Sequence, residues 1–268
     1  MPPSPSLPHA LVTGASSGIG TDIAREYARR GKPLVLTARR LDRLEALAAE
    51  LGKQVPCTVL AADLADPAAP EALFAQTLGR GIFVDTLVNN AGFGVPGRYL
   101  SADWKTHADS IQVLLTSVAH LTHLYLPAME AAGRGRILNV ASLAGLVPAT
   151  AGHTLYGATK AWLIRFSETL DQESRGRGVY VTALCPGMTY TEFHDVNGMR
   201  EKVSKLPKGI WLTSAEVARQ GVEAVESGRV RLVTGRSNKL IAGLSKYLPD
   251  ALARALLASK AKDFRDAD

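Results

Sequence analysis

The chain has 268 residues, of which 46% are hydrophobic and 21% are charged, and its formal net charge is +6. This composition is typical of one globular α/β domain and does not require a second one. No run approaches the roughly 18 apolar residues of a membrane span. The basic residues are dispersed and only 6% of residues are aromatic, which argues against a nucleic-acid partner.

The cysteines and the first residues indicate a cytoplasmic protein. Cys57 and Cys185 each lie in an apolar run, so we expect buried free thiols, as in a reducing compartment. Residues 1–8 are proline-rich and lack the basic-then-apolar order of a signal peptide. We expect them to form a disordered lead.

From residue 9 onward, short apolar runs rich in β-branched residues alternate with longer helical patterns. This alternation predicts stacked βαβ units, that is, a parallel sheet with helices on both faces. The expected strands span residues 9–13, 33–38, 55–61, 83–89, 135–141, 179–184 and 231–234. The expected helices span residues 19–30, 41–51, 67–79, 102–132, 155–175 and 214–227.

Two C-terminal segments depart from the alternation. Residues 187–212 lack a clear period and contain several glycines and a proline, which predicts a mobile loop. Residues 237–258 form an amphipathic helical pattern that Pro249 interrupts.

A glycine-rich turn joins the first expected strand to the first helix. Its sequence is TGASSGIG, residues 13–20. Glycines and small residues let the backbone approach a pyrophosphate, and the helix N-terminus stabilises its charge. The same letters fit the Gly-x-Ser-x-Gly elbow of hydrolases, but that serine belongs later in the sheet with downstream acid and histidine partners. The candidate nucleotide contacts are Gly14, Ser16, Ser17, Gly18, Ile19 and Gly20.

The residues at the end of the second expected strand indicate which nucleotide the protein binds. An acidic residue here would bind a free ribose 2′-hydroxyl, but Ala38 occupies the expected position and Arg39 and Arg40 follow. A guanidinium would instead pair with the 2′-phosphate of NADP(H), through hydrogen bonds worth about 1.5–3 kcal/mol each. The alternative is that both arginines are solvated at the start of the next helix. We expect NADP(H), with Arg39 as the stronger candidate.

Five segments together resemble the short-chain dehydrogenase/reductase family in order and spacing. They are TGASSGIG at 13–20, NNAG at 89–92, Ser142, YGATK at 156–160 and the Pro-Gly pair at 186–187. The resemblance covers about residues 9–235. The GRSNK segment at 235–239 resembles a bacterial branch of general short-chain dehydrogenases, which names no substrate.

The chemistry of the family explains Ser142, Tyr156 and Lys160. Tyr156 and Lys160 are four residues apart, so they share a helix face. A lysine cation, helped by an oxidised nicotinamide, would lower the tyrosine pKa from about 10. Tyr156 would then exchange a proton with the substrate oxygen, while Ser142 orients the carbonyl. The alternatives are a surface Tyr/Lys pair and a capping serine.

The resemblance also implies further contacts. Lys160 would hold the nicotinamide ribose, and Asn89 would tie neighbouring strands. Asp63 and Leu64 would contact adenine. Its ribose would be lined by Asn90, Ala91 and Gly92. The nicotinamide half would contact Pro186, Gly187, Thr189 and Thr191.

One position departs from the family. Many members carry an asparagine in the long fourth helix, which supports a helix irregularity and a water that contacts the lysine. Leu114 stands at that position, and its side chain cannot form the hydrogen bonds of the amide. The backbone carbonyl could still hold the water, or Gln112 could compensate if the register differs. This departure puts efficient turnover in doubt and keeps a second hypothesis open, a catalytically weak NADP(H)-binding sensor or scaffold.

Other signals carry less weight. His120 and His123 have helical spacing but lack a third ligand nearby, so we expect no metal site. His153 precedes Tyr156 by three residues and borders the expected cleft or an ordinary loop. The leucine-rich tail, residues 240–257, could meet anionic lipid, but we expect it to pack over the substrate loop or a second subunit.

The sequence therefore predicts one Rossmann-like α/β domain at residues 9–236, with a C-terminal helical extension at 237–268. Its sheet should have the order 3-2-1-4-5-6-7, with NADP(H) across the carboxyl strand ends. We expect reversible hydride transfer to a small carbonyl or alcohol substrate, with loop 187–212 closing over it. By analogy with the family, we expect a homodimer or homotetramer.

Overall fold

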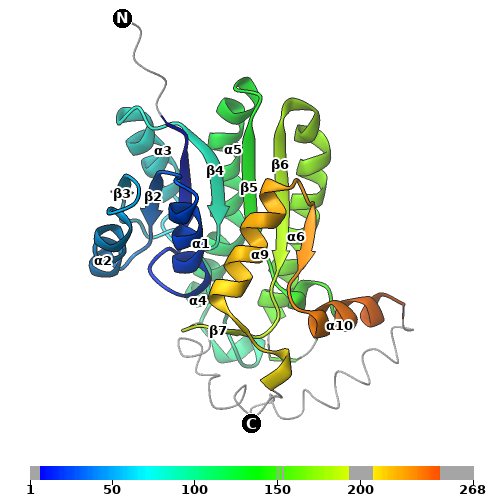
Figure 1. Ribbon diagram of the computed structural model, residues 1–268. Coiled ribbons are helices and arrows are strands. Elements are labelled where there is room, and N and C mark those ends of the chain that lie inside the picture. Colours follow the sequence, from blue (N-terminus) through cyan, green and yellow to red (C-terminus); the bar gives the residue numbers. More distant parts are fainter. Residues whose placement is uncertain (1–6, 150, 153, 193–207, 248–268) are drawn as a thin grey trace, which may run out of the picture.

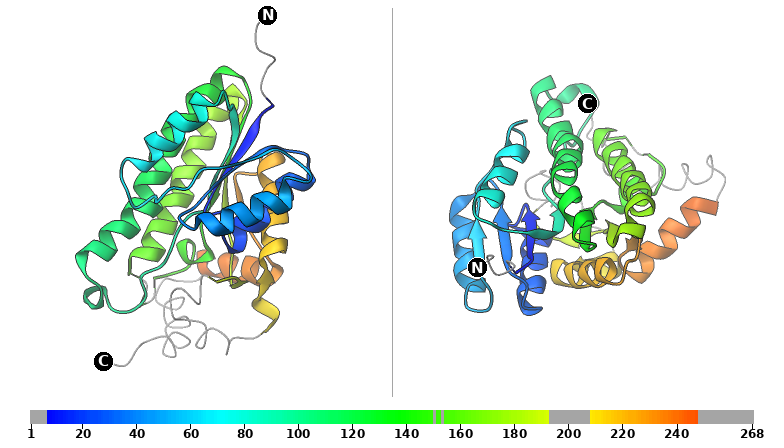
Figure 2. Two further views of the ribbon diagram at one scale, coloured as in Figure 1. Left: turned by 90° about the vertical axis from the view of Figure 1, so that its left-hand side faces the viewer. Right: turned by 90° about the horizontal axis from the view of Figure 1, so that it is seen from above.

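The computed structural model describes residues 7–149, 151–152, 154–192 and 208–247. Its main sheet has seven parallel strands in the order β3-β2-β1-β4-β5-β6-β9. Helices cover both faces of this sheet (Figures 1 and 2). Since β9 is the seventh strand of the main sheet in chain order, the predicted Rossmann-like order is confirmed.

The elements follow the sequence pattern closely. The strands of the main sheet are β1 (His9–Thr13), β2 (Leu34–Thr37), β3 (Cys57–Val59), β4 (Val84–Asn89), β5 (Gly135–Val140), β6 (Val179–Cys185) and β9 (Arg231–Val233). The principal helices are α1 (Gly18–Arg29), α2 (Leu41–Leu51), α3 (Ala69–Gly79), α4 (Trp104–Ile111), α5 (Ser117–Ala131), α6 (Thr154–Ser174), α9 (Ser214–Glu226) and α10 (Arg236–Tyr247).

Two apolar layers enclose the sheet. On one face, Ile23 of α1 and Val222 of α9 are fully buried against side chains of the central strands. On the other face, Leu73 of α3 and Leu121 of α5 are equally buried, and α6 packs through Leu163 beside them. Burying both faces explains why the strands carry continuous apolar runs rather than alternating ones.

The predicted helix at 102–132 contains a structural break. Its middle is a π-helical turn, η2 (Gln112–Thr116), in which the backbone N–H of Ser117 bonds to the carbonyl of Gln112. Asp103 caps the N-terminal part, α4, by accepting a hydrogen bond of 2.8 Å from the backbone of Thr106. Such single π turns are frequent at functional sites.

Part of the predicted loop 187–212 is ordered by pairing. The short strands β7 (Thr189–Tyr190) and β8 (Leu212–Thr213) run parallel, and Tyr190 stacks on Trp211 at 4.6 Å. The centre of this loop, residues 193–207, lies outside the described residues, as do most of the predicted lead and the helical pattern beyond residue 247 with Pro249.

Both cysteines are free, but only Cys185 is fully buried, and Cys57 is half-buried. Burial raises the pKa of both thiols, so each is a weak nucleophile at neutral pH. Within the described part of the chain, no helix is long and apolar enough to cross a membrane.

Candidate active site

A large cavity lies at the carboxyl edge of the sheet. Its volume is about 1120 Å³, slightly above the roughly 300–1,000 Å³ of ordinary ligand pockets. Nearly all the sequence-predicted site residues line it. Those lining residues are Gly14, Ser16, Ser17, Gly18, Ile19, Arg39, Arg40, Asp63, Leu64, Asn90, Ala91, Gly92, Ser142, Tyr156, Lys160, Pro186, Gly187, Thr189 and Thr191.

Gly20 is the exception, because it is buried beneath the turn. A Cβ at Gly20 would lie 2.4 Å from both the carbonyl oxygen of Gly14 and Nδ2 of Asn90. Gly14 and Gly18 line the cavity with positive φ angles of 65° and 59°. The turn therefore needs glycine at these three positions for conformation and close packing, which leaves its backbone open toward the cavity.

The side chains of Thr13 and Asn90 join the glycine-rich turn to the end of β4. Asn90 donates from Nδ2 to the carbonyl of Thr13 at 2.9 Å. The Thr13 hydroxyl donates to Val88 O at 3.0 Å and accepts from the backbone N–H of Ala91 at 3.0 Å. Sequence reasoning missed this role of Thr13, for which its place before Gly14 was the only signal.

The two arginines after β2 lie in different environments. Arg40 donates to the hydroxyl of Ser17 at 2.8 Å, to that of Ser16 at 3.2 Å and to Glu192 at 3.2 Å. Glu192 also pairs with Arg43 at 2.7 Å, and the guanidinium groups of Arg43 and Arg40 hold its pKa below the usual value.

Arg39, in contrast, is exposed and forms no hydrogen bond or ion pair within the described part of the chain. Its guanidinium is free to meet an anion in the cavity. Neighbouring Ala38 also lines the cavity and brings no negative charge to this end of it.

A buried hydrogen-bond chain orients the helix that carries the candidate catalytic pair. Asn89 of β4 donates to Asn139 of β5 at 2.8 Å, and Asn139 donates to Ser167 of α6 at 2.9 Å. Asn89 therefore ties neighbouring strands, and Asn139 extends the connection to α6. At the third strand end, Asp63 closes a turn by accepting from the backbone of Ala65 at 3.0 Å.

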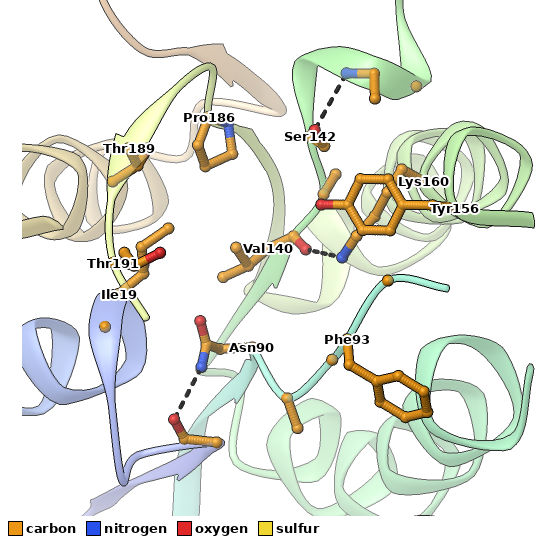
Figure 3. Close-up of a pocket in the computed structure, with 18 of the residues that line it drawn as sticks. Ile19, Asn90, Phe93, Val140, Ser142, Tyr156, Lys160, Pro186, Thr189 and Thr191 are labelled. Carbon is orange, nitrogen blue, oxygen red and sulfur yellow. Dashed lines mark hydrogen bonds between the residues drawn. The ribbon is translucent and has the colours of Figure 1, made fainter. Parts of the chain in front are cut away.

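Ser142, Tyr156 and Lys160 meet at the cavity wall (Figure 3). Ser142 begins the short 3₁₀ turn η3 (Leu143–Gly145), and its Oγ accepts from the backbone of Ala144 at 3.1 Å. The Lys160 ammonium donates to the carbonyl of Val140 at 2.7 Å and lies 5.6 Å from the Tyr156 ring centroid. One strand end and one helix thus hold the three side chains.

Burial shifts the pKa values of both Tyr156 and Lys160. Burial raises the pKa of Tyr156 to about 12, and a hydrogen bond with Ser142 only partly opposes this shift. Burial also lowers the pKa of Lys160 to about 8. Burial therefore dominates the tyrosine pKa when the chain's own groups act alone. The expected lowering involves Lys160 together with an oxidised nicotinamide, and it stays a prediction.

Leu114 packs instead of forming hydrogen bonds. It is 2% exposed, and a Cβ on Gly92 would lie 2.7 Å from its Cδ2. Gln112 does not compensate for the missing amide, since its Nε2 donates to the Ser117 hydroxyl at 3.2 Å. The π turn nevertheless forms around Leu114, so an asparagine side chain is not required for the irregularity.

Two close contacts at the site were not predicted. A Cβ on Gly145 would lie 2.6 Å from the backbone carbon of Lys160, so η3 rests directly on α6. Asn238 of α10 lies against Gly187, where a Cβ would be 2.3 Å from its amide nitrogen. Both contacts join segments far apart in sequence, and neither carries a local signal.

The histidines singled out in the sequence give no sign of a metal site in the described part of the chain. His120 comes within 3.6 Å of Glu71 on α3, while His153 lies outside the described residues. Among the described residues, no three histidine, cysteine or acidic side chains gather as they would around a metal ion.

Comparison with known proteins relates the site to a family. A family model described as short chain dehydrogenase matches residues 8–201. Sulfoacetaldehyde reductase of Chromohalobacter salexigens is 40% identical over 188 residues, which cover 68% of this chain and 73% of the relative. NADP-dependent 3-hydroxy acid dehydrogenase YdfG of Salmonella typhi is 39% identical over 202 residues, covering 73% and 79%. A solved short-chain dehydrogenase from Sphingobium yanoikuyae in complex with NADPH is 34% identical, covers 98% of both chains and has a TM-score of 0.79.

Proposed function

The chain belongs to the short-chain dehydrogenase/reductase family of oxidoreductases, and we propose that it is an NADPH-dependent carbonyl reductase. The observation that carries the proposal is the convergence of Ser142, Tyr156 and Lys160 on one wall of the cavity that the glycine-rich turn also lines. The relatives named for NADP and the solved neighbour with NADPH support the choice of cofactor.

The cavity has the features that a dinucleotide needs. The turn at Gly14 and Gly18 leaves room that a Cβ would fill, since a Cβ on Gly18 would lie 3.1 Å from Cβ of Thr191. The N-terminus of α1 follows this turn and favours a pyrophosphate. We assign the ribose 2′-phosphate to Arg39 with support from Arg40, because these cations line the same end.

The remaining contacts are assigned by their place along the cavity. Asp63 and Leu64 follow β3 and would border adenine, and residues 90–92 would line its ribose. Lys160 would hold the nicotinamide ribose with the ammonium hydrogens that Val140 does not take. The nicotinamide half would meet the residues after β6, namely Pro186, Gly187, Thr189 and Thr191.

When bound, NADPH supplies the hydride, and the chain's own residues handle the oxygen of the substrate. Ser142 accepts a backbone hydrogen bond at Oγ and forms a hydrogen bond with Tyr156, so the two hydroxyls adjoin at the place where we put the substrate oxygen. Tyr156 is protonated at neutral pH because its pKa is raised to about 12. It therefore acts as the general acid and donates its proton to the oxygen as negative charge develops there.

The test follows NADPH oxidation by the purified chain over aldehydes, ketones and β-ketoesters, with NADH in parallel. We expect turnover that prefers NADPH and falls about 10²–10⁴-fold in Tyr156→Phe. Equal turnover by that variant would refute the assignment of Tyr156. NADPH binding without turnover on any carbonyl would instead favour a sensor or scaffold, and failure to bind NADPH would refute the proposal itself.

A further inference from the structure

The charged side chains that line the cavity are unevenly distributed. In the described part of the chain they are Arg39, Arg40, Asp63, Glu192 and Lys160. The first four lie at the ends of β2 and β3 and beside Arg40, around the proposed adenosine site. Lys160 belongs to the catalytic group, where its ammonium is held by the backbone carbonyl of Val140.

Beyond Ser142 and Tyr156 the wall is apolar. The segments that follow β5 and β6, the residues just before β8, and α10 contribute the side chains that form it. They are Leu143, Val147, Pro148, Met188, Ile210 and Ile241. No charged residue joins them among the described lining residues.

The polar groups that the structure describes near this wall do not supply a positive charge. Asn238 of α10 is 3% exposed, and its Nδ2 donates to the carbonyl of Thr234 at 2.9 Å. Thr154 is exposed at the start of α6 and carries only a hydroxyl. Among the described lining residues an anionic substituent would therefore lose its hydration without gaining a cation to pair with, whereas an apolar one gains from leaving water.

We infer that the carbonyl substrate carries an uncharged, apolar substituent, which the wall opposite the cofactor end binds with Ile241 as a specificity-determining residue. This inference rests on the proposed reductase function. It separates the chain from relatives named for sulfoacetaldehyde and 3-hydroxy acids, whose substrates carry a negative charge.

The first arm of the test compares ethyl 5-oxohexanoate with 5-oxohexanoate, which share the 5-oxohexanoyl chain; the ester carries an uncharged ethyl ester group where the acid carries a carboxylate. We expect kcat/KM with NADPH to favour the ester by about tenfold or more. Ile241→Arg should reverse or erase this preference, because it places a cation on the wall, whereas Ile241→Leu should keep it. NADPH affinity measured for both variants shows whether the fold is retained.

The second arm does not depend on turnover. Binding of hexanamide and of hexanoate to the enzyme–NADPH complex is measured by the change in cofactor fluorescence. We expect the amide to bind better to the wild type and the carboxylate to gain in Ile241→Arg. If the amide is preferred but no carbonyl is reduced, the proposed reductase is wrong and the binding chemistry stands.

Two outcomes would overturn the inference. One is preference for the carboxylate by the wild type in either arm, which leaves the reductase function intact. The other is failure of both ligands to bind while NADPH still binds, because the apolar wall would then not be a ligand site.

Discussion

Replacing Arg39 with alanine tests which side chain selects a phosphorylated ribose. Arg39 is exposed, lines the cavity and has no hydrogen-bond partner among the described residues. A 2′-phosphate would therefore add hydrogen bonds without breaking existing ones. One charge-assisted bond is worth about 1.5–3 kcal/mol, so the Kd for NADPH should rise about 10- to 150-fold in Arg39→Ala.

Arg40→Ala should behave differently, because Arg40 already bonds to Ser17 and Glu192. A phosphate contact at Arg40 exchanges one partner for another, so the specific loss of NADPH affinity should be smaller. Loss of the Arg40 side chain should also loosen the glycine-rich turn, and this should weaken the binding of NADH. Arg43 is the matched control, since it pairs with Glu192 but does not line the cavity.

The assay is titration of each variant with NADPH and NADH by cofactor fluorescence. For Arg39→Ala, the Kd of NADH should change by less than about twofold while that of NADPH rises at least about tenfold. An equal rise for both cofactors, or no change in either, would refute the reasoning. A similar NADPH loss in Arg43→Ala would show that general positive charge, rather than contact in the cavity, determines the preference.

Three further substitutions test the architecture of the site. Leu114→Asn should lower the unfolding free energy in urea by about 2–4 kcal/mol without raising kcat, because it removes apolar packing on Gly92 and buries an amide; a gain in kcat would contradict this. Gly145→Ala should lower both Tm and kcat, because its Cβ would lie 2.6 Å from the Lys160 backbone, whereas Gly79→Ala meets nothing within 4 Å and should be tolerated. The pKa of Lys160 falls from 10.5 to about 8 on folding, so Lys160 holds more protons in the unfolded chain between these values, and this residue alone should raise the unfolding free energy by about 2 kcal/mol from pH 8 to pH 10. Groups that act in the opposite direction, such as the buried Cys185 thiol with its raised pKa, are common to both proteins, so over this range the unfolding free energy of the wild type should gain about 2 kcal/mol relative to that of Lys160→Met; an equal pH dependence of the unfolding free energy in the two proteins would contradict the assignment.

Local signals located most elements to within a residue or two. The predicted strand at 9–13 matches β1, because its apolar run ends where Gly14 adopts a positive φ. The strand predicted at 55–61 spans only Cys57–Val59. It lies at the sheet edge and pairs only with β2. The pairing extends over three positions, and this limits the length of β3. Such a limit depends on the neighbouring strand and is absent from the local pattern.

Local irregularities and pairings between distant segments were harder to predict from the sequence than the elements themselves. The π turn at residues 112–116 falls within a continuous helical pattern, and nothing in the residues themselves marks it. The pairing of Thr189 with Leu212 joins two strands of two residues each. Strands this short have no readable period, so the sequence indicated only a loop.

The same division holds within the site. Spacing placed Tyr156 and Lys160 on one helix face, and both line the cavity. The support from Gly145 depends on how closely η3 approaches α6, which a one-dimensional pattern does not contain. The raised pKa of Tyr156 in the chain without cofactor was not foreseen for a related reason, since it depends on burial by segments distant in sequence.

The raised pKa of Tyr156 has a consequence for the direction of the reaction. At neutral pH the tyrosine holds its proton, and an alkoxide formed by hydride arrival is a much stronger base than a tyrosinate, so proton donation is downhill. Alcohol oxidation would first require the tyrosine to lose a proton from a group with a pKa of about 12. The oxidation rate should therefore rise with pH well above neutrality, while the reduction rate stays level or falls. Matching pH profiles for the two directions would show that a different group, or a tyrosine with a lowered pKa, moves the proton.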